Sequence, residues 1–366
     1  MATATPPPET ATIAVAAECH CSNFRATFTL PTSSFPLKAS ICHCTTCRKT
    51  AGHILPTWAV IPSTQRPDVS ALTAYTSSNS LTRFFCPKCG ARIADFEANE
   101  WDIATGLLDK IGDGLLNRVQ IWLEDTKDTG GAIWLKLPYS ECHMRGRTSE
   151  RLAFEDVKEM AESRRKETKA ISLDSTSAHC QHQNMKGDWL NASCHCGAVA
   201  FQIARPDTST NESASNKYSA GLDACTSCRK VSGCEITSWA IVPRDRISTC
   251  IRDVSKNSDS KGNNQHPLDL LDMSALTYYK SSPAVTRGFC STCGANVFYY
   301  RHRGNMGKED TIDIAAGLLE SRVGVRAEDW LAWDHYGDDV VGYSEDALDK
   351  GLVEGLVRGI QEDDMS

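Results

Sequence analysis

Three cysteines at close spacing are the residues in this chain most suited to chemistry. Cys42, Cys44 and Cys47 form a C-x-C-x-x-C run, followed at once by Arg48 and Lys49. Cysteine binds a metal as the thiolate, and three thiolates this close would repel one another unless a divalent cation neutralised them. Zinc is the usual ion for all-sulfur ligation, and a site with only three protein ligands leaves a position for water or substrate. The run therefore predicts an open zinc site.

The chain repeats itself once. The segment CRKTAGHILPTWAVIP, which starts at Cys47, returns as CRKVSGCEITSWAIVP from Cys228, and DIATGLL from Asp102 returns as DIAAGLL from Asp313. Matched blocks in the same order predict duplicated domains. A length of 366 residues suits two domains of ordinary size.

The second copy helps to sort the cysteines into sites, because spacing alone permits several partitions. It keeps the outer cysteines but carries Asp223, Cys225 and Cys228 in place of the central run. The outer four are therefore predicted to form a closed structural zinc site. These predicted ligands are Cys19, Cys21, Cys86 and Cys89 in the first copy and Cys194, Cys196, Cys290 and Cys293 in the second. A carboxylate still binds zinc but is less selective than a thiolate, so the second open site is predicted to be the weaker one.

The short apolar runs are β-rich and are separated by Pro, Gly, Ser and Asn, which favours a mainly β fold of small antiparallel sheets. Strands are predicted over Phe24–Leu30, Thr57–Ile61, Leu72–Thr76, Trp101–Ala104 and Val119–Leu123. Such small units bury little apolar area per residue, so metal staples are expected. Aromatic residues that recur in both copies are predicted to be core; they are Trp58, Phe85, Trp239 and Phe289.

The predicted organisation runs from a disordered tail to an acidic tail. The segments are the tail 1–14, a first zinc domain 15–145, a charged linker 146–187, a second zinc domain 188–345 with an insertion at about 251–270, and an acidic tail 346–366 that frays. Within the linker, Arg151–Lys169 has the composition of a helix. Its cluster Arg164–Lys166 is predicted to be a solvated face, with a nuclear-import or acidic-partner role as the alternative.

Composition restricts the possible partners and the compartment. The net charge of -7 argues against nucleic acid and anionic membranes as partners. No signal peptide is recognisable in residues 1–18, and no segment is apolar enough to span a membrane. Seventeen cysteines without secretion favour metal sites over disulfides. The expected location is the cytoplasm, with the nucleus as an alternative.

Four motifs together resemble the glutathione-dependent formaldehyde-activating enzyme family, which includes relatives of centromere protein V. They are Cys-His-Cys at 19–21, CHCTTCRK at 42–49, FCPKCG at 85–90 and DIATGLL at 102–108, and both copies carry the likeness. The resemblance implies two tandem β-tent domains, a four-Cys structural zinc in each, a three-Cys zinc that binds a thiol substrate, and carbon–sulfur lyase chemistry on S-hydroxymethylglutathione. It supplies no residue pattern for a glutathione pocket. Ser22 departs from the family's Gly, which the second copy keeps as Gly197.

The chemistry of the first open site follows from its charge. Three thiolates give a zinc site one net negative charge, which weakens its polarisation of a carbonyl but still suits a fourth thiolate. A substrate thiol there would lose its proton and could attack an aldehyde or expel one from a hemithioacetal. Catalysis is therefore predicted mainly at Cys42, Cys44 and Cys47. Arg48 and Lys49 are predicted either to bind substrate carboxylates or ligand sulfurs, or to form surface salt bridges.

Other titratable residues are weaker candidates. His43 is a possible catalytic residue because the second copy has Ala224 there, but a non-catalytic role is favoured. His20 and His195 lie between two ligands and are predicted to be turn residues. Four cysteines match nothing across the copies and are predicted to be free thiols; they are Cys142, Cys180, Cys234 and Cys250.

Two classes of function fit the sequence. One is a zinc-dependent carbon–sulfur lyase or thiol-adduct enzyme acting on a small thiol such as glutathione. The alternative is a zinc-stabilised binding module for a protein or nucleic-acid partner, without catalysis. The intact C-x-C-x-x-C run favours the enzyme, because a scaffold needs no open coordination position.

Overall fold

The computed structural model describes residues 11–109, 114–137, 141–171, 188–206, 216–249, 273–302, 310–333 and 340–364. Within these residues the protein is mainly β with four α-helices, as the sequence predicts. Several predicted features lie outside the described residues: most of the N-terminal tail, the end of the linker and the insertion at 251–270, together with Cys180 and Cys250.

The first repeat consists of a hairpin and a large sheet. Its elements are β1 (Thr12–Glu18), β2 (Arg25–Pro31), β3 (Leu37–Cys42), α1 (Thr45–Ala51), β4 (Thr57–Ile61), β5 (Thr73–Thr76), β6 (Thr82–Phe85), β7 (Arg92–Glu97), β8 (Glu100–Ala104), β9 (Leu116–Ile121), β10 (Glu141–His143) and β11 (Arg151–Leu152). The sheet order is β11-β10-β9-β3-β4-β8-β7-β6-β5. Most neighbours are antiparallel, but β3 pairs with β9 in parallel, which the sequence pattern did not indicate.

The second repeat has the same arrangement. Its elements are β12 (Trp189–Ser193), β13 (Ala200–Ala204), β14 (Tyr218–Asp223), α3 (Thr226–Ser232), β15 (Thr237–Pro243), β16 (Ile247–Thr249), β17 (Leu276–Ser282), β18 (Val285–Cys290), β19 (Asn296–Arg301), β20 (Thr311–Ala315), β21 (Leu331–Trp333) and β22 (Val341–Gly342). The larger sheet has the order β17-β18-β19-β20-β15-β14-β21, with β22 also on β14, and β12-β13-β16 form a separate sheet.

The repeats pack against each other through matched contacts, as expected for an approximate two-fold relation. The N–H of Gly317 donates to the carbonyl of Gly52 at 2.8 Å, and the N–H of Gly106 donates to the carbonyl of Gly233 at 3.0 Å. A Cβ added at Gly52 would lie 2.2 Å from the carbonyl oxygen of Asn296, so only glycine permits this approach.

One hydrophobic cluster spans the two repeats, and a second is formed by buried residues of the first repeat. Ile54 and Leu55 of the first repeat belong to the same buried cluster as Trp239 and Phe298 of the second. The four recurring aromatic residues are all buried, which confirms their prediction as core; they are Trp58, Phe85, Trp239 and Phe289. The repeats therefore share one buried cluster, in addition to the cluster that belongs to the first repeat alone.

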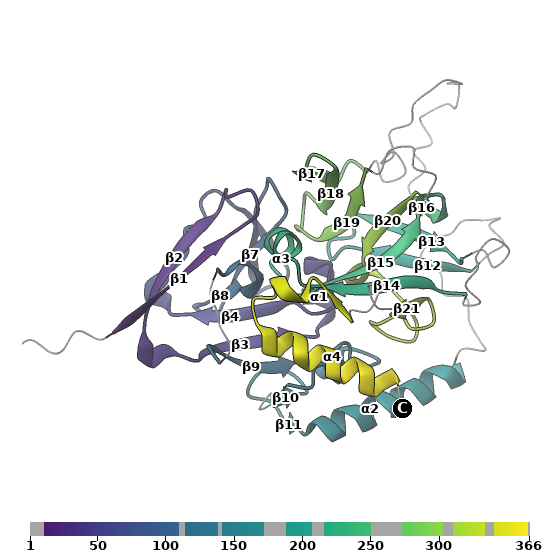
Figure 1. The fold of residues 1–366 in the computed structure, drawn as a ribbon, viewed down its shortest axis with the longest axis horizontal. Helices are drawn as coiled ribbons and strands as arrows, with labels where there is room; N and C mark the ends of the chain where they lie inside the picture. Colours follow the sequence, from purple (N-terminus) through teal and green to yellow (C-terminus); the bar gives the residue numbers. More distant parts are fainter. Residues whose placement is uncertain are drawn as a thin grey trace, which may run out of the picture.

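The C-terminal segment does not fray, contrary to the prediction. Residues Lys350–Asp364 form helix α4, which lies across the middle of the molecule in Figure 1 and contacts the 3-10 turn Ala132–Trp134 of the first repeat. Leu352, Leu356 and Ile360 are buried. Their four-residue spacing places them on one face of the helix, and the surrounding acidic residues concealed this stripe in the sequence.

The predicted linker helix is present as α2, which covers Phe154–Ile171. Val157 and Ala161 are buried in the shared core, so the helix belongs to the folded body. Arg164 donates to the carbonyl oxygens of Leu123 and Thr126, at 3.4 and 2.5 Å, so it is not simply a solvated cation. None of the described helices has the length and apolar composition of a membrane span.

Candidate metal centres

Each repeat brings its four outer cysteines together. In the first, the Sγ atoms of Cys19 and Cys21 are 3.7 Å apart, and those of Cys21 and Cys86 are 3.5 Å apart. The corresponding sulfurs of the second repeat are 3.5 and 3.6 Å apart. A tetrahedron with Zn–S bonds of about 2.3 Å places its sulfurs about 3.8 Å apart. Both clusters therefore fit zinc, and in each of them all ligand atoms lie within 4.8 Å of one another.

The turn that carries Cys21 accommodates the departure from glycine. Ser22 adopts φ 58°, the left-handed conformation that Gly197 adopts at φ 76° in the second repeat. A side chain in this region is strained. The Ser22 hydroxyl donates to Glu18 Oε1 at 2.6 Å, which holds the turn, and both neighbouring thiols stay in the cluster.

The three-cysteine run folds into one cluster at the start of α1. Cys42 ends β3, Cys44 is the N-cap of α1, and the Cys44 Sγ accepts the N–H of Cys47 at 3.2 Å. Their sulfurs lie within 4.8 Å of one another, and no other His, Cys, Asp or Glu in the described part of the chain joins them. Cys42 and Cys47 are buried, whereas Cys44 is partly exposed. The site fits a zinc with three protein ligands and an approach from the Cys44 side.

A buried arginine that the sequence reasoning missed contacts this cluster. Arg83, on β6, donates from Nη2 to the Cys47 Sγ at 3.3 Å, and its Nη1 pairs with Asp95 at 2.5 Å. The neighbouring thiols Cys42 and Cys44, together with the Arg83 charge, hold the pKa of Cys47 below its ordinary value. The signal was available in the repeat, because Thr-Arg precedes the later cysteine pair in both copies.

The second open site keeps this arrangement with one ligand changed. Asp223 ends β14, its Oδ1 accepts the N–H of Cys225 at 2.7 Å, and its Oδ2 lies 3.6 Å from the Cys228 Sγ. These three residues form a cluster of possible metal ligands. Arg287 donates to the Cys228 Sγ at 3.4 Å, as Arg83 does in the first repeat.

Buried cations lie beside both open sites. Arg83 and Arg92, paired with Asp95, lie beside the first site. In the second repeat, Arg287 lies over the ring of Tyr299 at 4.8 Å. Such cations favour the net negative charge that zinc and three anionic ligands would leave.

The comparison with known families agrees with this geometry. The profile of the glutathione-dependent formaldehyde-activating enzymes matches residues 14–125 and 189–332, which is more than half of the chain. The chain belongs to this family. Each matched stretch holds one four-Cys cluster and one open cluster, so the protein is a tandem two-domain member. No curated protein sequence matches the chain.

The two cations after the C-x-C-x-x-C run join the repeats of this family member. Arg48 is buried and donates to the carbonyl oxygens of Gly317 and Leu319, at 2.5 and 3.1 Å. Lys49 pairs with Glu320 and donates to Ser193 Oγ at 2.8 Å. Arg48 therefore does not form the surface salt bridge that was one of its predicted roles, and the ion pair of Lys49 crosses the interface.

The histidines have structural partners. His43 is buried, its Nε2 lies 3.2 Å from Gln120 Oε1, and burial lowers its pKa to about 4, so it is neutral at pH 7. His20 Nδ1 lies 2.7 Å from the Tyr279 hydroxyl, and His195 Nδ1 lies 2.6 Å from the Tyr75 hydroxyl. The predicted turn histidines thus also link the repeats, since each tyrosine belongs to the other copy.

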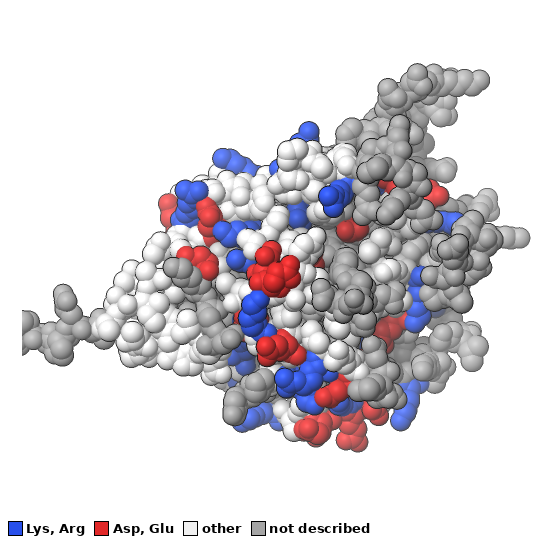
Figure 2. Space-filling view, in the orientation of Figure 1, with Lys and Arg blue, Asp and Glu red and all other residues white. Residues whose placement is uncertain are grey.

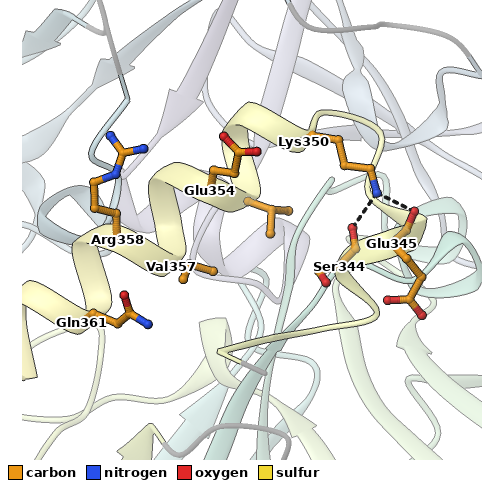
Figure 3. A pocket seen from close by; sticks show the side chains of 8 residues that line it. Ser344, Glu345, Lys350, Glu354, Val357, Arg358 and Gln361 are labelled. Atoms are coloured by element: carbon orange, nitrogen blue, oxygen red, sulfur yellow. Dashed lines mark hydrogen bonds between the residues drawn. The ribbon is translucent and has the colours of Figure 1, made fainter. Parts of the chain in front are cut away.

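Two depressions lie near these elements. One, of about 340 Å³, is lined by Thr45 and Arg48 at the first open site. The other is a groove of about 560 Å³ along α4, where Lys350 Nζ donates to the carbonyls of Ser344 and Glu345 (Figure 3). No residue of a metal cluster lines this second groove.

On the face shown in Figure 2, cations and anions are interspersed, which offers no basic track for nucleic acid.

Proposed function

We propose that this protein is a zinc-dependent carbon–sulfur lyase that forms or cleaves thiol–aldehyde adducts, with S-hydroxymethylglutathione as the substrate that its family indicates. Catalysis is assigned mainly to Cys42, Cys44 and Cys47 of the first repeat. The observation that supports it is a cluster of three sulfurs with no fourth protein ligand among the described residues. A purely structural site would close with four.

The residues around the cluster have distinct roles in this proposal. Zinc held by the three thiolates would provide a position at which a substrate thiol binds as its thiolate. Cys44 is the partly exposed ligand, so it marks the side from which the substrate enters. Arg83 stabilises the Cys47 thiolate through its hydrogen bond, and Asp95 holds the Arg83 guanidinium in position.

The reaction balances without an added oxidant or reductant. In cleavage, the C–S bond of the adduct breaks and its electron pair stays on sulfur. The C–OH group becomes the aldehyde carbonyl, and its hydroxyl proton leaves to water. Formation is the reverse, with the thiolate attacking the aldehyde carbon and the new alkoxide taking a proton.

The compartment belongs to the same proposal. Cys142 and Cys234 are buried thiols outside the metal clusters, and burial raises the pKa of each, to about 11 and about 12. Such thiols are inert, and a reducing compartment keeps the cluster thiols available for metal. We therefore assign the protein to the cytoplasm, with the nucleus as the alternative.

The test is catalysed exchange between glutathione, formaldehyde and their adduct, measured by NMR with the zinc-loaded full-length protein. Wild type should accelerate the exchange, and Cys44→Ala should abolish the acceleration while the melting temperature stays close to that of wild type. Cys142→Ala is the matched control, because it removes a thiol outside every cluster. Retained exchange in Cys44→Ala would place the chemistry elsewhere, and no exchange by zinc-loaded wild type would refute the proposed reaction.

A further inference from the structure

The cavity beside the first open site is built by both repeats. Its volume is about 340 Å³. Thr45 and Arg48, which directly follow Cys44 and Cys47, form one side together with Asp125–Lys127 of the first repeat. The opposite side is the segment 319–325 of the second repeat. The cavity thus begins at residues that directly follow two ligands of the cluster, and the second repeat completes its wall.

The wall from the second repeat is fixed in place. Arg326 is fully buried; its backbone N–H donates to Asp128 Oδ2 at 2.9 Å and its Nη1 donates to the Asp128 carbonyl at 2.8 Å. A Cβ added at Gly324 would lie 2.2 Å from the Asp128 Cγ, so the two backbones meet as closely as glycine allows. Since these contacts lock the two walls together, the cavity is formed before any ligand arrives.

The charges in the cavity favour an anion. Its two carboxylates already have donors, because Glu320 pairs with Lys49 and Asp125 accepts the N–H of Thr45 at 2.5 Å. Arg322 and Lys127 are exposed cations on the cavity wall. Within the described residues, neither has a carboxylate partner, and Lys127 Nζ reaches only the Arg322 carbonyl at 3.5 Å. The lining carries three cations, Arg48, Lys127 and Arg322, against the two carboxylates, so a net positive charge remains for an anionic ligand.

We propose that this cavity binds the carboxylate groups of the substrate thiol, so that the second repeat supplies part of the binding site for chemistry at the first. This inference rests on the proposed function and adds the place at which the carboxylates of such a thiol bind, namely the wall that the second repeat supplies. The volume lies at the small end of ligand pockets, which suits the polar end of such a molecule rather than the whole of it. Arg322 acts in selection between thiols and is not a catalytic residue.

The experiment compares two thiols in the same zinc-loaded protein. The ratio of kcat/KM for the formaldehyde adduct of glutathione to that of 2-mercaptoethanol is measured for wild type, Arg322→Ala and Lys127→Ala. Loss of one charge-assisted hydrogen bond should lower this ratio by roughly tenfold through KM, and Arg322→Glu should lower it further. Arg301→Ala is the control, because it removes the same charge from an exposed position outside the cavity and should leave the ratio unchanged.

The outcomes separate this inference from the proposed reaction. Turnover with the same ratio in wild type and Arg322→Ala would overturn the cavity assignment and leave the reaction intact. If wild type turns over neither adduct, the proposed reaction fails, and calorimetric titration with glutathione still tests the cavity. Weaker glutathione binding to Arg322→Ala than to wild type would then support the cavity. Equal binding, or no binding to wild type, would overturn it.

Discussion

Arg83 donates a hydrogen bond to the Sγ of Cys47 at 3.3 Å, and Arg287 makes the same bond to Cys228 at 3.4 Å. The duplication has thus preserved a buried cation on one sulfur of each open site while the first ligand changed from Cys42 to Asp223. A hydrogen bond to a ligand sulfur orients the ligand and stabilises its thiolate form. The second site therefore retains the surroundings of a metal centre, although its ligand set has diverged.

The two arginines differ in what their removal would leave behind. Arg83→Met would leave Asp95 buried with only Arg92, whose nearest approach is 3.7 Å, whereas Arg287 pairs with no carboxylate in the described part of the chain. We expect Arg83→Met to lower the free energy of unfolding by about 3 kcal/mol and Arg287→Met by about 1–2 kcal/mol, because an orphaned buried charge costs more than a lost hydrogen bond. Guanidinium chloride unfolding measures both values. Equal losses would show that Asp95 contributes nothing to the difference.

The four-Cys clusters should be required for folding. Cys86→Ser or Cys290→Ser should each remove one zinc per chain and lower the melting temperature, because the free energy of metal binding is part of the free energy of folding. Since the core crosses both repeats, either variant should melt in one transition rather than leave half of the protein folded. Zinc analysis and calorimetry provide the measurements, with Cys142→Ser as the control. An unchanged zinc content in either variant would remove that four-Cys assignment.

The second open site should release its metal first. A hard carboxylate in place of a soft thiolate weakens zinc binding, and burial raises the pKa of Asp223, which disfavours its metal-binding form. Titration with a mild chelator should therefore remove one zinc before the other three, or find that site already empty. Asp223→Cys should make all four ions resistant. Simultaneous release of all ions from wild type would contradict the predicted divergence of the two sites.

The sequence was informative about the metal clusters because their ligands are local and duplicated. Cys42, Cys44 and Cys47 lie within six consecutive residues, and comparison with the second copy indicates which cysteines form one metal site. It was uninformative about Arg48, since no local pattern indicates that a guanidinium will meet two carbonyls of the other repeat. Contacts between residues that are hundreds of positions apart depend on how the repeats pack. The helix α4 is stabilised by such contacts, so the sequence alone predicted a tail there.

Acid should destabilise the interface through His53. Its Nδ1 accepts the N–H of Ser238 in the other repeat at 3.1 Å, and burial lowers its pKa to about 3. The unfolded chain takes up a proton below about pH 6.5 while the folded chain does not, so stability is present above that pH and is lost as pH falls toward 3.

The repeat itself offers a non-titrating replacement, because Cys234 occupies the position of His53 in the second copy. Between pH 6.5 and pH 5, His53→Cys should lose about 1.7 kcal/mol less of its unfolding free energy than wild type, since a full proton corresponds to about 1.4 kcal/mol per pH unit and the unfolded imidazole is half protonated at about pH 6.5. Zinc release at low pH affects both proteins, so it cancels in the difference. Identical pH dependence of the two proteins would mean that His53 is protonated in the folded state.

The interface predicts that the two repeats cannot be separated without loss of structure. Arg118 of the first repeat is buried and donates to both carboxylate oxygens of Glu235 at 2.8 Å and to Asp349 Oδ2, also at 2.8 Å. A first repeat expressed alone would lose these ion pairs and would expose apolar residues of the shared cluster to water. A protease site introduced between residues 172 and 187 provides the test. After cleavage, the two fragments should co-elute on size exclusion and keep their zinc and their single melting transition.

Each fragment isolated under denaturing conditions should refold only when mixed with the other in the presence of zinc. Fragments that separate, retain zinc and melt independently would show that the contacts between the repeats contribute little to stability, and that each repeat folds as a module of its own.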